Sequence, residues 1–453
     1  MKRVTRSILL CLMLCLVSVT ASGCGGIGFT LNPQELYSLP QLPTKYDELN
    51  TLLGQILEGG AEYAAPVSGA NMQVVQMVDL DDDGQEEAMA FFRNSADEKP
   101  LKIYIFAATE ESYRQLAVIE NSGTGIYSID YSDLDGDGQR ELLVGWRVST
   151  DMQVLSVYSL RRGEPEELVR TNYVKYARID LNEDGRQELV VLRTDNEGDS
   201  IAEYYGWSDE GGLLPQSTAR LSMTMAELSQ QGRVKRGVLR DEVPALFVTG
   251  VAESAFSITD ILTVKNGELA NVVLSDATGV SSANTGFYSL YPSDINNDGL
   301  TEVPWPVYLP AKEGMEPGRR IEWRCYDSGG QAETVMSTYH DVENGWYLQL
   351  PEVWQGNILA SRSSTADEST VTFSIRGQNG EEPQDFLKIS TLTGSSRESR
   401  AVRGNRFSLS RRKETIYVAE LLEANSVWEF GITEDEVRAS FSLIAAEWIA
   451  GDN

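Results

Sequence analysis

The sequence predicts a mainly β fold: a β-propeller of about five four-stranded blades, followed by a small C-terminal α+β domain. Two observations favour this class. An acidic loop with one fixed spacing of Asp, Asn, Gly and Glu occurs four times, beginning at residues 79, 133, 180 and 294. Each loop precedes an apolar run, and a repeat of 47 to 57 residues has the length of four short strands. A chain of 453 residues is too long for one ordinary core, which agrees with a repeat array and a further domain.

The N-terminal residues predict export and a lipid anchor. Residues 1–23 have a basic start, an apolar segment at 7–19 and small residues before Cys24, as in a secretory leader. The sequence Ala21-Ser22-Gly23-Cys24 resembles the lipobox of bacterial lipoproteins, which implies cleavage before Cys24 and lipidation of that residue. An ordinary cleaved leader with a stray Cys is the alternative. The apolar segment is too short to span a bilayer comfortably, so we expect an extracytoplasmic protein that is lipid-anchored to the bacterial cell membrane.

Residues 24–65 predict a tether and one helix. The stretch 25–43 is polar and punctuated by Gly and Pro, which suits a tether without a fold of its own. Apolar residues recur at helical spacing over 46–57, and Gly59 and Gly60 end the pattern. We expect a short amphipathic helix that packs against the first repeat; a partner-binding helix is the alternative.

The repeat region, residues 66–341, is expected to contain one degenerate copy. The loop starts are 54, 47 and 114 residues apart, and the last gap is twice 57. In the middle of this gap, residues 242–248 resemble residues 302–307, the tail of the last repeat, which begins with the Glu at position nine. This unit lacks the acidic front half of the loop, so we expect it to bind no ion. Its ligand positions would be occupied by Val234, Arg236 and Val238.

The acidic loops have the composition of a calcium site. Asp or Asn stands at positions one, three and five, Gly at position six gives the freedom for a tight curl, and Glu stands at position nine. Position seven offers a backbone carbonyl, so its side chain is free to vary. All-oxygen ligands favour a hard cation, and a flexible loop favours Ca²⁺ over Mg²⁺. We therefore expect up to four structural Ca²⁺ ions. Acidic β-turns without an ion are the alternative, mainly for the loops that begin at Asp180 and Asp294.

The predicted ligands at positions one, three, five, seven and nine are, in chain order, Asp79, Asp81, Asp83, Gln85, Glu87; Asp133, Asp135, Asp137, Gln139, Glu141; Asp180, Asn182, Asp184, Arg186, Glu188; Asp294, Asn296, Asp298, Leu300 and Glu302. An EF-hand would need helical flanks and a Glu at position twelve, where this chain has Ala90, Val144, Val191 and Trp305. With the core D-x-[DN]-x-[DN]-G-x-x-E, the loops resemble the FG-GAP/VCBS repeats, the calcium-binding propeller repeats of integrin α-subunits and many bacterial surface proteins. The resemblance covers about residues 70–340 and implies a calcium loop in each intact blade.

The rest of the composition argues against several functions. The formal net charge of −30 makes nucleic acid an unsuitable partner. His340 is the only histidine, and no nucleophile motif surrounds it, so a catalytic triad is not expected. The sequence also has no phosphate-binding glycine loop and no Cys/His metal cluster. Cys325 alternates with apolar residues and is expected to be a buried thiol.

These observations favour a binding or scaffolding module over an enzyme. We expect the propeller to present loops to a protein or a cell-surface glycan. Tyr204, Tyr205 and Trp207 are candidates for stacking on sugars, although aromatic residues at strand ends are more often part of the core. Two alternatives stay open: a polysaccharide-acting enzyme with a carboxylate pair, and a purely structural surface protein.

Residues 342–453 are expected to form the α+β domain, because the acidic loops stop and the composition shifts to Ser, Thr, Arg and Glu. The pattern predicts strands at 346–350, 370–375, 386–393 and 415–421, with loops at 361–369 and 394–403. Thr433 and Glu436 form a capping box. The apolar residues after it are at helical spacing and predict a closing helix that includes Val437, Phe441, Ile444 and Trp448.

Overall fold

The computed structural model describes residues 46–109, 112–161, 163–208, 212–251, 257–285, 290–310, 312, 318–377 and 381–444. The predicted leader, Cys24, the tether and Trp448 lie outside these residues. Contacts divide the chain into two compact units, residues 1–56 and 57–453. In the described parts of the chain, no helix combines the length and the apolar character needed to cross a membrane.

The helix predicted at 46–57 is confirmed. α2 covers Asp47–Glu58, and its buried residues, Leu49 and Leu53, lie four positions apart. Gly60 follows the helix in the left-handed conformation, with a φ of 90°, which is common just after a helix end.

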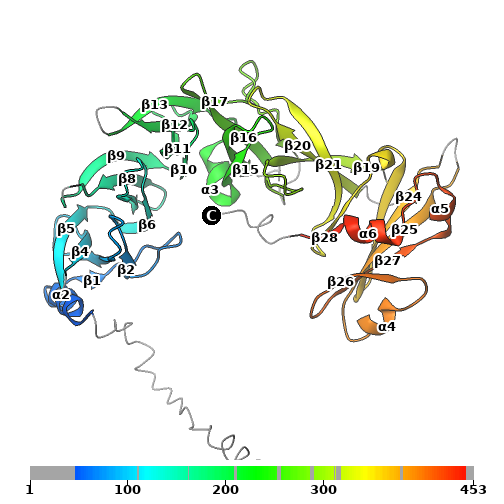
Figure 1. Cartoon of the computed structure of the whole chain (residues 1–453), viewed down its shortest axis with the longest axis horizontal. Coiled ribbons are helices and arrows are strands. Elements are labelled where there is room, and N and C mark those ends of the chain that lie inside the picture. The colour runs from blue at the N-terminus through cyan, green and yellow to red at the C-terminus, as the bar shows by residue number, and fades with distance from the viewer. Residues whose placement is uncertain are drawn as a thin grey trace, which may run out of the picture. The chain divides into compact units, whose positions relative to one another are not determined.

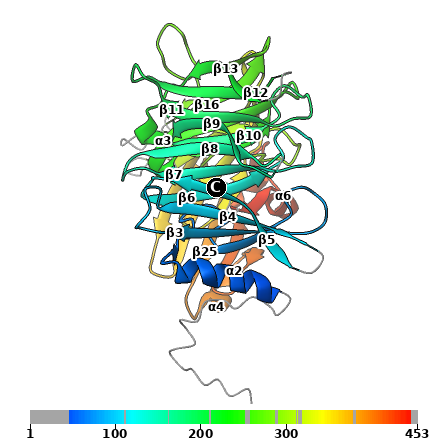
Figure 2. The same ribbon diagram turned by 90° about the vertical axis from the view of Figure 1, so that its left-hand side faces the viewer.

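Six antiparallel sheets follow one another along the second unit (Figure 1, Figure 2). The first contains β1 (Glu62–Tyr63), β2 (Val75–Val78), β3 (Glu87–Arg93), β4 (Leu101–Ala108) and β5 (Tyr113–Asn121). The second contains β6 (Gly125–Ser132), β7 (Glu141–Arg147), β8 (Gln153–Ser159) and β9 (Glu166–Tyr173). The third contains β10 (Lys175–Ile179), β11 (Glu188–Thr194), β12 (Ser200–Trp207) and β13 (Leu213–Arg220).

The fourth sheet contains β14 (Arg233–Val238), β15 (Pro244–Val251), β16 (Ser257–Lys265), β17 (Glu268–Asn271) and β18 (Asn284–Thr285). The fifth contains β19 (Glu302–Leu309), β20 (Gly318–Tyr326), β21 (Ala332–Asp341), β22 (Trp346–Gln349) and β28 (Phe441–Leu443). The sixth contains β23 (Ile358–Ser364), β24 (Glu368–Ile375), β25 (Gln384–Leu392), β27 (Ile416–Leu421) and β26 (Phe407–Arg411). Short helices connect these strands: α3 (Met225–Gln231), η3 (Glu352–Trp354), α4 (Arg397–Ala401), α5 (Glu423–Val427) and α6 (Glu434–Ser440).

The first five sheets share one topology, in which four strands pair in chain order. The predictions of a mainly β fold and of several four-stranded antiparallel sheets are therefore confirmed. In the first three sheets, the acidic loop joins the first two strands, and position nine pairs with the residue before position one: Glu87 with Val78, Glu141 with Ser132, and Glu188 with Ile179. In the fifth sheet, a bridge between Ser293 and Glu302 closes the loop in the same way.

The strand that follows the second acidic loop, β7, is covered on both faces. In β7, Leu142 and Val144 belong to a core cluster shared with the first sheet, whereas Leu143 belongs to one shared with the third. All three residues are 0% exposed. The continuous apolar run after the acidic loop therefore reflects a neighbouring sheet on each side.

The degenerate unit forms a sheet of the expected topology, but its loop differs from the prediction. Val234, Arg236 and Val238 lie in strand β14, not in the loop. Val238 pairs with Pro244, so the loop is a short hairpin of residues 239–243, in which Glu242 has a φ of 63°. Since position nine of the intact loops stands eight residues after position one, this hairpin is too short to curl around an ion.

The C-terminal region departs from the prediction at four places. The strand at 346–350, assigned to the domain that begins at residue 342, is β22 and pairs with β21 of the fifth sheet. The capping box of Thr433 and Glu436 is confirmed, but the helix ends at Ser440, and Phe441 begins strand β28, which pairs with β22. Pairing with an open sheet edge outweighs the helical spacing, and Phe441 also stacks on Trp346 at 5.6 Å. The predicted loop at 361–369 contains the end of β23 and the start of β24, and the predicted loop at 394–403 contains helix α4.

Candidate metal centre

The acidic loops curl around the carboxylate at position one. The amide of the position-six Gly donates to Asp79 at 3.0 Å, Asp133 at 3.0 Å, Asp180 at 2.9 Å and Asp294 at 2.9 Å. These glycines have φ values between 84° and 89°, a conformation that other residues adopt only with strain. The predicted role of Gly at position six is therefore confirmed.

Position four also takes the left-handed conformation, which was not predicted from the sequence. It is held by Asp82, Gly136, Glu183 and Asn297, with φ values of 56°, 76°, 60° and 60°. Asp, Gly and Asn tolerate this conformation well, so their frequency at position four was a usable signal. Glu183 is the exception, and the third loop carries that strain.

The Glu at position nine is buried beneath each loop. Its Oε2 atom accepts a hydrogen bond from the amide of position two: Leu80 at 3.0 Å, Leu134 at 3.0 Å, Leu181 at 2.8 Å and Ile295 at 3.1 Å. The four glutamates are between 0% and 7% exposed. Burial, together with the neighbouring negative charges, raises the pKa of Glu141, Glu188 and Glu302 to about 7, and it also raises the pKa of Glu87.

Several carboxylate oxygens in the loops have no hydrogen-bond partner. Among the described residues, Glu141 Oε1, Glu302 Oε1 and Asp79 Oδ1 are buried and unsatisfied. A buried oxygen without a partner costs about 1–3 kcal/mol, and more if it is charged. Three groups of carboxylates each bring their oxygens within 4.8 Å of one another: Asp79, Asp81 and Glu87; Asp133, Asp135 and Glu141; Asp180, Asp184 and Glu188. These groups can hold a metal ion, and their donor set of oxygens alone fits a hard cation.

The loop at Asp294 is less acidic. Its Asn296 donates from Nδ2 to Asp298 at 2.8 Å, and Asn182 donates in the same way to Asp184 at 3.2 Å. An amide at position three therefore removes one negative charge and satisfies one carboxylate oxygen within the loop. At position seven, the backbone amide donates to the carboxylate of position five in every loop, as from Gln139 to Asp137 at 2.8 Å. In the first loop the side chain of Gln85 also donates to Asp83, at 3.2 Å.

Among the acidic loops, the second is the one with ion pairs to a cation of the described chain. Arg161, in the turn after β8, forms ion pairs with Asp135 and, at 3.0 Å, with Asp137. Its guanidinium also lies over the ring of Trp207, 5.7 Å from the centroid. Asp135 and Asp137 are two of the predicted ligands, so Arg161 and a metal ion would compete for the same oxygens.

Neighbouring loops are joined through their backbones. The amide of Arg140, at position eight, donates to the carbonyl of Leu80 at 2.7 Å, and the amide of Gln187 donates to the carbonyl of Leu134 at 2.8 Å. The first three loops thus form a connected row at one end of their sheets.

The remaining candidate residues are mostly core residues. Tyr204 and Tyr205 are 4% and 6% exposed, so the suggestion that they stack on sugars is wrong. Cys325 is a buried free thiol, as predicted. Both ring nitrogens of His340 are buried without a partner, and burial lowers the pKa of His340 to about 3. The imidazole is therefore neutral and packs between Trp323 and Tyr347.

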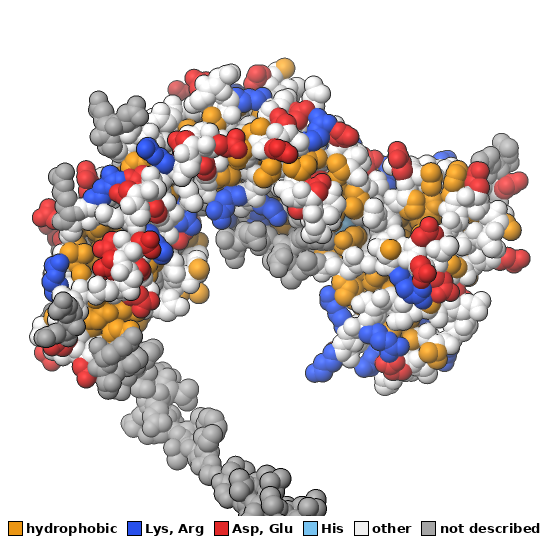
Figure 3. All heavy atoms as spheres, viewed as in Figure 1, with side chains coloured by type: hydrophobic (Ala, Val, Ile, Leu, Met, Phe, Trp, Pro, Cys, Tyr) orange, Lys and Arg blue, Asp and Glu red, His pale blue; other side chains and the backbone are white. Residues whose placement is uncertain are grey.

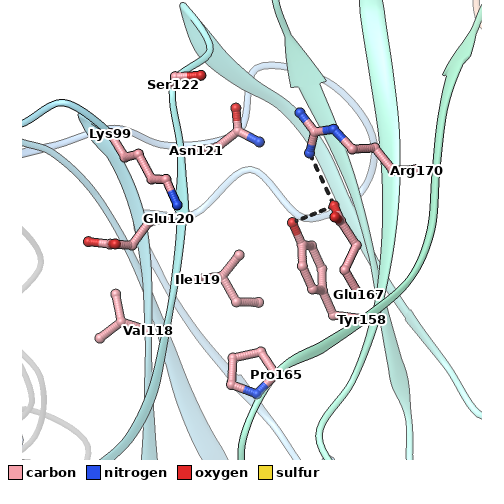
Figure 4. Close-up of a pocket in the computed structure, with 10 residues that line it drawn as sticks. All are labelled: Lys99, Val118, Ile119, Glu120, Asn121, Ser122, Tyr158, Pro165, Glu167 and Arg170. Carbon is pink, nitrogen blue, oxygen red and sulfur yellow. Dashed lines mark hydrogen bonds and ion pairs between the residues drawn. The ribbon is translucent and has the colours of Figure 1, made fainter.

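One pocket of about 360 Å³ lies between β5 and β9 (Figure 4). It contains two carboxylates, but each is held by neighbours: Glu167 accepts from Tyr158 and Arg170, both at 3.1 Å, and Glu120 is ion-paired with Lys102. This arrangement does not provide a free acid and base that face one substrate.

No family model and no curated protein matches the sequence. Among solved structures, the chain is similar to a periplasmic gluconolactonase of Pseudomonas aeruginosa, with 12% identity, a TM-score of 0.25, and coverage of 69% of this chain and 95% of that one. It is also similar to the AfRom2 CNH domain, with 13% identity, a TM-score of 0.24 and coverage of 76% and 93%. A protein from Lactobacillus plantarum gives 9% identity, a TM-score of 0.21 and coverage of 65% and 93%. At these values the similarities assign no activity to the chain.

Proposed function

We propose that this protein is an extracytoplasmic, lipid-anchored calcium-binding β-propeller that acts as a binding or scaffolding module for a protein or a cell-surface glycan. The observation that carries the calcium proposal is the set of buried, unpartnered carboxylate oxygens in the loops. The resemblance to FG-GAP/VCBS repeats supports Ca²⁺ as the ion, and the five sheets of shared topology support an arrangement as five blades.

The ions would be held by the side chains at positions one, three, five and nine and by the carbonyl of position seven. When bound, Ca²⁺ supplies positive charge that favours the ionised form of the position-nine Glu. Each of the first three loops joins the ends of two strands, and the fourth is closed by the bridge between Ser293 and Glu302. An ion in a loop would therefore stabilise the sheet without taking part in a reaction. Extracellular calcium modules bind at about 0.1–1 mM, which in millimolar calcium corresponds to roughly 1 kcal/mol per site.

The calcium proposal is tested by thermal unfolding of residues 25–453. In millimolar Ca²⁺ we expect the melting temperature to rise by about 4 °C over the value in chelator, since four sites give roughly 4 kcal/mol and a chain of this size has a large unfolding entropy. Mg²⁺ should give a smaller rise. Equal curves in calcium and in chelator would refute the proposal.

A pair of matched variants assigns the effect to the loops. Glu141→Gln removes a ligand from the second loop and should reduce the calcium-dependent rise by about a quarter. Glu242→Gln changes the same residue type in the degenerate hairpin and should leave the rise unchanged. If both variants behave alike, the ions bind elsewhere.

The anchor and the ligand need separate experiments. Cys24→Ser should release the full-length protein from the membrane fraction when it is expressed in a bacterial host. For the ligand, the anchor-free protein is incubated in calcium with cell-wall polymers, and both retention and release of reducing ends are measured. Retention without release supports a binding module, whereas turnover would favour the carboxylate-pair enzyme.

A further inference from the structure

The first strands of the third and fourth sheets are basic in an otherwise acidic protein. β10 has the sequence KYARI and β14 the sequence RVKRGV. Five of these eleven residues are Lys or Arg and none is Asp or Glu, whereas the whole chain has 38 Lys and Arg among 453 residues. Such an enrichment, against a net charge of −30, calls for a physical reason.

These cations come together because the two strands are neighbours. β10 and β14 are in contact, and Arg236 donates to the backbone carbonyl of Arg178 at 3.4 Å. Arg236 follows Arg178 by 58 residues, and Arg233 follows Lys175 by the same number. The two strands therefore have cations at equivalent positions. Figure 3 shows Lys and Arg side chains gathered where Figure 1 places α3 and β10.

Three of these cations, Lys175, Lys235 and Arg236, have no carboxylate partner among the described residues. Arg178 is paired with Asp130 at 2.6 Å. Within the part of the chain that the structure describes, Lys175 and Lys235 form no ion pair or side-chain hydrogen bond, and Arg236 contacts only a carbonyl. Burial and the charge of Arg233 lower the pKa of Lys175, as expected where like charges accumulate.

Protection of an exposed sheet edge does not account for the cluster. Lysines on edge strands prevent pairing with other chains, and β10 and β14 are edge strands. However, β2 and β6 are the equivalent strands of the first two sheets, and they contain no Lys or Arg. Nor do the cations replace a missing calcium ion, because they lie in the strands and not in the degenerate hairpin.

We propose that Lys175, Lys235 and Arg236 form a binding site for an anionic polysaccharide. These three cations have no carboxylate partner among the described residues, and they suit a ligand with repeated carboxylate, sulfate or phosphate groups; each contact formed would relieve repulsion within the cluster. The inference rests on the proposed function as a glycan-binding module, since it names the chemical class of that ligand. It does not depend on calcium in the loops.

The test is binding of residues 25–453, in calcium, to three polymers of similar length: dextran sulfate, polygalacturonate and uncharged dextran. The basic-cluster variant is Lys175→Gln/Lys235→Gln/Arg236→Gln. The control variant, Arg403→Gln/Arg412→Gln/Lys413→Gln, removes the same charge from exposed positions outside the cluster. A third variant, Lys175→Arg/Lys235→Arg/Arg236→Lys, keeps the charge of the cluster.

We expect the wild type to bind one or both charged polymers and not dextran. Affinity should fall at least about tenfold in the basic-cluster variant and remain within about twofold in the control and charge-preserving variants. Melting curves of all variants check that the fold is intact. Absence of binding by the wild type, or equal binding by the basic-cluster and control variants, would overturn the inference. Loss of the calcium effect on melting with binding preserved would instead refute only the calcium sites.

Discussion

The ion pairs of Arg161 lead to a specific prediction about the calcium affinity of the second acidic loop. Because its guanidinium pairs with Asp135 and Asp137, a Ca²⁺ ion must displace it before those carboxylates can bind the metal. Arg161→Gln should therefore raise the calcium affinity of this loop above that of the wild type, although most changes near a metal site lower affinity.

The size of the effect follows from the exposure of the ion pairs. The side chain of Arg161 is 40% exposed, so each of its two pairs is worth about 0.5 kcal/mol. Loss of both contacts gives about 1 kcal/mol, which corresponds to a dissociation constant about five times lower in the variant. Arg161 does not pair with the other three intact loops, so their calcium affinity should not change in the variant.

Terbium luminescence can report on this loop selectively. Trp207 lies beside Arg161, so a Tb³⁺ ion held in the loop should be sensitised by this indole, and Ca²⁺ should displace it in proportion to its affinity. Trp207→Phe should abolish the signal, which identifies the loop. Arg170→Gln is the control, because Arg170 pairs with Glu167 away from the loop. An unchanged or weaker calcium affinity in Arg161→Gln would refute the reasoning.

Three further predictions concern stability. In chelator, the free energy of unfolding should fall as the pH rises from 4.5 through 7, because the folded state holds a proton on Glu141, whose pKa of about 7 lies above its unfolded value. In urea unfolding, Glu141→Gln should make this dependence on pH less steep. An unchanged dependence would contradict the raised pKa of Glu141. His340 is the opposite case: its folded pKa of about 3 lies below the usual 6.5, so stability is lost as the pH falls below 6.5, by about 2 kcal/mol at pH 5. His340→Phe should remove that loss of stability, as measured by the urea midpoint at pH 5 and pH 8. An equal fall of the midpoint in the wild type and the variant would contradict this prediction. Phe247 is 1% exposed in the core cluster shared by the fourth and fifth sheets, and Phe247→Ala should lower the free energy of unfolding by about 3–5 kcal/mol. The control, Val402→Ala at an exposed position, should lower it by less than about 0.5 kcal/mol. Equal losses in the two variants would mean that this cluster does not stabilise the fold.

The acidic loops could be predicted from sequence because their geometry is local. A Gly at position six and a buried Glu at position nine are set by the curl of a nine-residue loop, and any sequence with this spacing meets the same constraint. The apolar run that follows the loop was equally informative, since a strand between two sheets must be apolar on both faces.

Features that depend on distant partners were not predicted. Phe441 continues the helical spacing of α6, but it becomes a strand because β22, almost a hundred residues earlier, offers a free edge. The shortened hairpin at 239–243 was misaligned because the absence of ligands leaves no pattern to mark the loop. Arg161 was missed for a similar reason: its partners in the second loop precede it by more than twenty residues, and nothing in its local sequence marks the contact.

The backbone bonds between neighbouring loops have a consequence for cooperativity. Loops one to three are linked in series, from Arg140 to Leu80 and from Gln187 to Leu134, so ordering of one loop by an ion lowers the entropy cost of ordering the next. A second series joins the fourth and fifth sheets, where the amide of Thr301 donates to Val238. In the described residues, no backbone hydrogen bond of this kind joins the third loop to the shortened hairpin. Calcium titration should accordingly resolve into two independent phases, one for three coupled sites and one for the isolated site at Asp294.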